Sequence, residues 1–161
     1  MSDDEEPSTL DERLSMNSWS GGPSAKERGA VQRAVNDLLD TLAPEQQLTR
    51  RERATQRVEQ HRTPSAVILQ GATAAVSVTW FADAAIDGTF GELHLLVWRG
   101  VLARRGVANN RGGAQLVSEQ ILRPVIQDDG SCVWEVQNGP RYDTPTLAAR
   151  CVALLEEQLA A

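Results

Sequence analysis

The two histidines are the side chains of this sequence best suited to acid–base chemistry near neutral pH. His94 lies in the apolar segment 89–98, and His61 follows an arginine-rich segment. Catalysis by histidine needs a nucleophile or an orienting acid within reach, and neither histidine has a serine, cysteine or aspartate at a spacing that indicates one. The nucleophile pattern G-x-S-x-G does not occur either. We therefore interpret both histidines as structural residues.

Acidic residues gather at two predicted turns. Asp83, Asp87 and Glu92 surround the first, and Asp128 with Asp129 begins the second. Paired carboxylates can bind a hard cation or exchange protons with a substrate. Aspartate also favours turns, because its side chain hydrogen-bonds nearby backbone groups. Turn formation explains these positions more simply, and no catalytic residue is assigned.

Cysteine and glycine patterns indicate no cofactor site. Cys132 and Cys151 are isolated thiols outside any C-x-x-C or Cys/His cluster, so a zinc site is not expected. A disulfide between them is disfavoured in a reducing compartment, and we interpret both as small buried apolar residues. The glycine-containing loop 109–113 lacks the phosphate-binding pattern G-x-x-x-x-G-K-[ST]. The sequence therefore predicts neither a metal nor a cofactor.

The net charge of −6 is concentrated at the N-terminus. Residues 1–23 are acidic and poor in apolar side chains, so they cannot bury enough surface to offset the entropy of ordering and are predicted to be disordered. The rest of the chain is close to neutral. Four apolar residues of this acidic tail could form a short docking motif for a partner: Leu10, Leu14, Met16 and Trp19.

The composition is that of a globular domain, with 41% hydrophobic and 24% charged residues. No apolar run approaches the roughly 20 residues that span a bilayer. The acidic start of the chain is also the opposite of a signal peptide, which begins with basic residues. We therefore expect a cytoplasmic protein with no membrane contact.

Residues 24–62 are predicted to be helical. Ser24 and Glu27 form a capping box, in which each side chain accepts a hydrogen bond from the other residue's backbone N–H, and apolar residues recur at helical spacing up to Leu42. Beyond Pro44 the pattern is poor, because charged side chains cover most of the helix. Such a polar helix bridges solvent or depends on a partner. Four of its arginines are the predicted partner-binding residues: Arg50, Arg51, Arg53 and Arg57.

Between residues 63 and 138 the apolar periodicity changes to two, which is typical of strands. Turn signals such as Asp87-Gly88 separate the apolar runs and predict antiparallel hairpins. Pro124 cannot donate a hydrogen bond to a neighbouring strand, so its run is expected at an edge or a bulge. The predicted strands are 65–70, 75–81, 89–98, 115–126 and 131–137.

The chain ends in an amphipathic helix predicted over residues 144–160. Thr144 is suited to the N-cap position and Pro145 to the first turn. Helices at both ends of a run of hairpins indicate the α+β class rather than a parallel α/β fold. We predict one domain, 24–161, in which an antiparallel sheet of four to six strands has the N-terminal helices and the C-terminal helix on one face.

The leading functional hypothesis is a non-enzymatic protein-binding module, either an adaptor, a chaperone-like protein or a regulator. Three features favour it: the acidic tail, the arginine-rich segment, and the proline-bearing strand that is expected at an edge. A protein partner is therefore expected, and a homodimer stays open.

Two alternatives stay open as well. The first is a ligand-binding or enzymatic domain with a pocket between the sheet and the C-terminal helix. The expected lining of that pocket is Trp80, His94, Trp98 and Trp134. The second is weak nucleic-acid binding through the segment 50–62. A pI near 4.9 and the lack of interleaved aromatic residues for base stacking argue against it.

Overall fold

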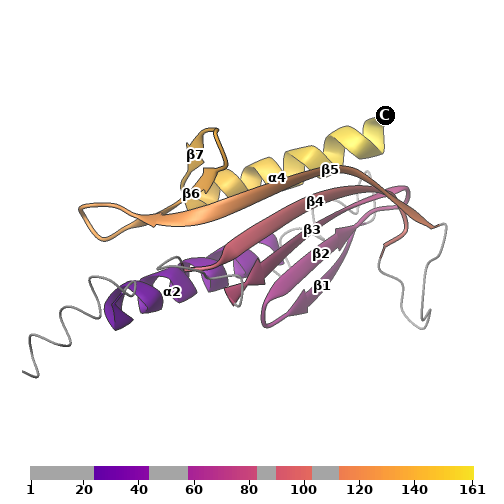
Figure 1. Ribbon diagram of the computed structural model, residues 1–161. Helices are drawn as coiled ribbons and strands as arrows, with labels where there is room; N and C mark the ends of the chain where they lie inside the picture. The colour runs from indigo at the N-terminus through magenta and orange to yellow at the C-terminus, as the bar shows by residue number, and fades with distance from the viewer. Residues whose placement is uncertain (1–23, 44–57, 83–89, 103–112) are drawn as a thin grey trace, which may run out of the picture.

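Seven strands and two helices make up the residues that the computed structural model describes, which are 24–43, 58–82, 90–102 and 113–161. Each strand pairs antiparallel with its neighbours in chain order, so the sheet is a meander. Both helices pack on one face of this sheet (Figure 1). The elements are α2 (Ala25–Leu42), β1 (Glu59–Thr63), β2 (Ala66–Gln70), β3 (Ala74–Phe81), β4 (Glu92–Gly100), β5 (Ala114–Ile126), β6 (Cys132–Val136), β7 (Arg141–Tyr142) and α4 (Thr144–Ala160).

The predicted α+β class and antiparallel sheet are confirmed, but the described residues form seven strands instead of four to six. The strands that were not predicted lie at the two edges. β1 occupies residues 59–63, of which 59–62 were predicted to be helical. Pro64 turns the chain back after Thr63, so pairing with β2 outweighs a composition that suits a helix. β7 is only two residues long and leaves no periodic signal in the sequence.

The N-terminal helix α2 begins as predicted. Ser24 Oγ accepts a hydrogen bond from the Glu27 backbone N–H at 3.1 Å, and Glu27 Oε1 accepts one from the Ser24 N–H at 3.0 Å. This confirms the capping box. The apolar stripe of α2 faces the sheet and is buried: Val31, Ala34, Val35, Leu38, Leu39 and Leu42.

The C-terminal helix α4 is capped one residue earlier than predicted. Asp143 is the N-cap, because its Oδ1 accepts a hydrogen bond from the Thr146 N–H at 2.8 Å. Hydrogen bonding to the side chain of Thr146, followed by that to its backbone, lowers the pKa of Asp143. Thr144 is the first helical residue, and its hydroxyl accepts a hydrogen bond from Trp134 Nε1 at 3.2 Å. Neither α2 nor α4, the helices of the described residues, is long and apolar enough to cross a membrane.

We call the side of the sheet that packs on the helices the helix-covered face. Its apolar side chains are almost fully buried and join the inner stripes of α2 and α4 in one core. Trp80 and Trp134 meet edge to face at the centre of this layer, with ring centroids 6.0 Å apart. The other large members of this face are Val67, Leu69, Val76, Val78, Leu93, Leu95 and Leu122.

A buried glutamine holds the junction at which β4 ends. Gln70, at the end of β2, donates from Nε2 to the carbonyls of Ala74 and Gly100, both at 3.1 Å. Its Oε1 accepts a hydrogen bond from the Leu102 N–H at 2.7 Å. Gly100 has a φ of +106°, and a Cβ there would collide with the Gly113 carbonyl, so only glycine fits. These contacts fix where β5 starts beside β4.

Candidate functional site

The side of the sheet opposite the helices, which we call the helix-free face, is charged at one end. Glu92 accepts a hydrogen bond from Arg123 at 2.9 Å and lies 3.0 Å from His94 Nε2. The contact with Arg123, followed by that with His94, lowers the pKa of Glu92. Glu135 and Arg141 form a further ion pair at 3.1 Å, next to Arg123 in the strand register. Acids and bases therefore balance at this end.

The other end of the helix-free face is apolar. Trp98 lies opposite Leu116 in the register of β4 and β5, and its Nε1 donates to Ser77 Oγ at 3.1 Å. The described residues expose three large apolar side chains, which are Leu116 at 48%, Phe81 at 43% and Val117 at 41%. Leu116 and Val117 are neighbours in β5, whereas Phe81 pairs with Glu92 at the charged end. Grouped apolar side chains on a surface mark interaction sites.

β5 has different neighbours in its two halves. β4 pairs with it from Ala114 to Leu122, whereas β6 pairs with it only from Leu122 to Ile126. Over Gln115–Gln120 the described residues therefore give β5 a strand partner on the β4 side alone. We call this stretch the free β5 edge. Its residues are exposed, apart from the half-buried Gln120.

A β-bulge lies within the free β5 edge. The pairing of Val97 with Ser118 is followed by that of Trp98 with Leu116, so Val117 is an extra residue. Bulges re-aim side chains and occur near sheet edges and functional sites. Leu116 and Val117, the two exposed large apolar residues of β5, lie at this bulge.

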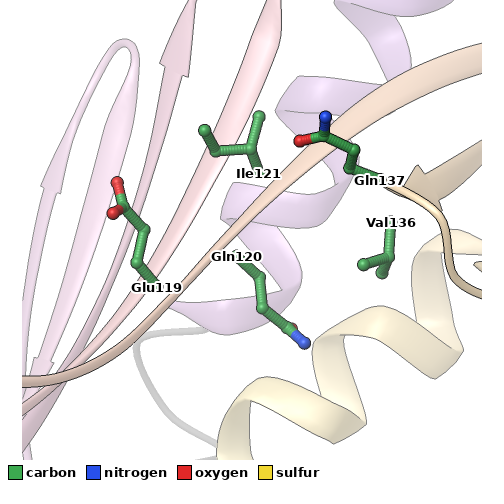
Figure 2. Close-up of a pocket in the computed structure, with 5 residues that line it drawn as sticks. All are labelled: Glu119, Gln120, Ile121, Val136 and Gln137. Carbon is green, nitrogen blue, oxygen red and sulfur yellow. The ribbon is translucent and has the colours of Figure 1, made fainter.

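A cavity of about 220 Å³ lies where the free β5 edge meets the end of β6. Figure 2 shows Glu119 and Gln120 leaving β5 on opposite sides, with Val136 and Gln137 at the right, at the end of β6. The fifth lining residue is Ile121, whose carbonyl accepts a hydrogen bond from the Gln137 N–H at 3.4 Å. Pockets for small molecules usually span about 300–1,000 Å³. This cavity is sized for a side chain rather than for a whole ligand.

The four residues expected to line a ligand pocket do not lie together. Trp80 and Trp134 are on the helix-covered face and fill the core. His94 and Trp98 are on the helix-free face, because they alternate along β4 with Leu93, Leu95 and Val97, which belong to the buried core. The sheet itself separates the two pairs.

Both cysteines were expected to be buried, but only Cys151 is, and Cys132 is half-buried. Burial raises the pKa of Cys132 to about 11 and that of Cys151 to about 12. A thiol nucleophile needs a lowered pKa, so neither cysteine is suited to that role. In the part of the chain that the structure describes, no three of the side chains His, Cys, Asp and Glu are grouped as they would be to hold a metal ion.

Several predicted features lie outside the described residues. These are the docking motif of the acidic tail, the first Asp-Gly turn and the partner-binding arginines Arg50, Arg51, Arg53 and Arg57. Comparison with protein-family models, with curated proteins and with solved structures finds no match for this chain. The surface chemistry of the described residues therefore carries the functional argument.

Sequence reasoning did not single out the free β5 edge. The segment 115–126 was correctly predicted as a strand, but Leu116 and Val117 were not considered as surface residues. One signal was available, because two consecutive apolar residues followed by Ser118 and Glu119 break the alternation of a half-buried strand. The length of β6, which decides where β5 loses its partner, has no such signal.

Proposed function

We propose that this chain is a non-enzymatic protein-binding module, acting as an adaptor, chaperone-like or regulatory protein. The observation that carries the proposal is the exposed pair Leu116 and Val117 on a strand edge that lacks a partner in the described residues. Burial of apolar surface contributes about 25 cal/mol per Å², and unpaired backbone groups add directional hydrogen bonds. A protein partner can bury the apolar side chains and hydrogen-bond to the unpaired backbone groups at the same time.

The charge distribution supports a protein partner over a nucleic acid. A nucleic-acid surface is a stripe of basic side chains. The charged end of the helix-free face instead alternates Glu92, Arg123, Glu135 and Arg141 in ion pairs. Phosphates would meet as many carboxylates as guanidinium groups there.

Packing between the sheet and α4 argues against the ligand-pocket alternative. Trp134 is 0% exposed, and its Nε1 is already bonded to the Thr144 hydroxyl. Leu147 and Cys151 of α4 are buried in the same core. The residues between the sheet and α4 thus act as core, and no observation on them favours a bound metabolite.

Site-specific photo-crosslinking in the native host tests the proposal. A benzophenone-bearing phenylalanine analogue replaces Val117 in one variant and Gln32, which is exposed on α2, in a control variant. We expect irradiation to link position 117 to a discrete protein and to leave position 32 without that adduct. Equal adduct patterns at both positions, or none at either, would contradict the proposal.

A further inference from the structure

The backbone of the free β5 edge is oriented to receive another strand. The Ile121 carbonyl points to the β6 side, because it accepts a hydrogen bond from the Gln137 N–H. Backbone groups alternate in direction along a strand, so the N–H and carbonyl of Glu119 point to the same side. β6 ends at Val136. A strand placed beyond that end, in the direction of β6, can therefore hydrogen-bond to the N–H and carbonyl of Glu119.

The side chains of this edge specify what the incoming strand carries. Leu116, Glu119 and Ile121 lie on the helix-free face, because they pair with Trp98, Leu96 and His94 of β4. Glu119 is the only ionisable residue within the free β5 edge, and it also lines the cavity at the end of β6. An apolar, an acidic and an apolar position thus follow each other along one face.

The size of the edge argues against a second copy of this chain as the occupant. Six residues of strand extend about 20 Å, and a sheet layer is about 10 Å thick. Edge-to-edge pairing of two copies would bury a few hundred Å² on each, whereas a stable interface buries roughly 800 Å² on each partner. A single extended segment needs less area, because its backbone hydrogen bonds and side-chain pockets supply the affinity.

We propose that an extended segment of a partner protein adds to the sheet along the free β5 edge. One basic side chain of this segment lies against Glu119 at the cavity, and an apolar side chain two positions away packs on Leu116. The motif is therefore a basic and an apolar residue separated by one position, because Gln137 already lies beside Ile121. This inference rests on the proposed protein-binding function and names the chemistry of the partner.

Nuclear magnetic resonance of the full chain tests the inference with defined probes. The first probe is the capped peptide Thr-Val-Thr-Arg-Thr-Val-Thr, and the matched probe has Glu in place of Arg. We expect the arginine peptide to shift the backbone amides of 115–121 and Gln137 and to bind about fivefold more tightly than the glutamate peptide, as for an exposed ion pair.

A charge reversal makes the assignment specific. Glu119→Arg, which is exposed and expected to leave the fold intact, should reverse the preference in favour of the glutamate peptide. Glu156→Arg, an exposed position on α4, is the matched control and should keep the original preference.

Three results would overturn strand addition by such a segment. The first is that neither peptide shifts any amide. The second is that the peptides shift amides around Ile68 and Leu96 but none in 115–121. The third is that light scattering gives the mass of two chains for the wild type and of one chain for Val117→Lys. The crosslinking experiment at position 117 does not depend on these peptides. A protein adduct at position 117 without any peptide-induced shift would refute strand addition but not protein binding.

Discussion

Two stretches of the sheet that lack a strand on one side in the described residues, β1 and the free β5 edge, differ in their side chains. All five residues of β1 are polar; Arg62 pairs with Asp40 of α2 at 2.9 Å, and His61 lies 3.5 Å from Glu59. The free β5 edge instead exposes two apolar residues and has one charge. Natural sheets protect their edges with charged side chains. β1 follows that practice, and we infer that β5 departs from it because a partner covers it.

Two leucines of β5 allow the sharpest comparison, because one lies in the core and the other at the free edge. Leu122 is 0% exposed in the core, whereas Leu116 is 48% exposed at the free edge. We expect Leu122→Ala to lower the free energy of unfolding by about 2–5 kcal/mol and Leu116→Ala to change it by less than about 0.5 kcal/mol. Urea denaturation measures both. Similar losses at the two positions would show that Leu116 is covered in the free chain.

Gln70 tests whether the β4–β5 junction positions the edge. We expect Gln70→Leu to cost about 1–3 kcal/mol of unfolding free energy, because the Leu102 N–H and several carbonyls lose a buried partner. The exposed Gln32→Leu on α2 is the control and should cost little. If Gln70→Leu unfolds like the wild type, the junction is held by other contacts.

Removing the charges of β1 and adding a charge to the free β5 edge tests whether charged side chains protect a sheet edge from association. We expect the double variant Glu59→Thr with Arg62→Val to self-associate in a concentration-dependent way, since β1 then lacks both charges. Leu116→Lys should instead reduce aggregation on heating. Static light scattering follows both. Unchanged association in the two variants would mean that edge composition does not govern contacts of this sheet.

The smallest effect is expected at the charged end of the helix-free face. The pKa of Glu92 lies below its ordinary value of 4.5, so its contribution to stability is complete above that value and is lost as pH falls through the lowered pKa. The loss should stay below about 1 kcal/mol, because the pairs are partly exposed. Unfolding measured at neutral pH and at about pH 3 should show a smaller change for Glu92→Gln than for the wild type.

Local signals in the sequence predicted much of the fold and little of the candidate site. The capping box of Ser24 and the turn at Asp129, whose Oδ1 accepts from the Ser131 N–H at 2.9 Å, act through neighbouring residues and were readable. β1 was missed because pairing with β2 is a tertiary contact. Pro124 was expected at an edge or a bulge, and it pairs only with β6, past the last residue that β4 pairs. The bulge itself lies at Val117.

The site depends on relations that the sequence does not encode locally. Which face Trp98 shares with Leu116, and where β6 stops beside β5, follow from the register of three strands. Period-two alternation shows that Trp80 and Trp134 could be buried, but not that Trp98 points to the other side. Strand length and register are set by the whole sheet.

Amide hydrogen exchange of the isolated full chain tests most directly whether the free β5 edge is available. The Glu119 N–H points away from β4, whereas the Gln120 N–H points toward Leu95. Measured residue by residue, we predict exchange at Glu119 on the order of a hundredfold faster than at Gln120. Equal protection of the two amides would show that the edge is already covered in the free protein, and would contradict the account.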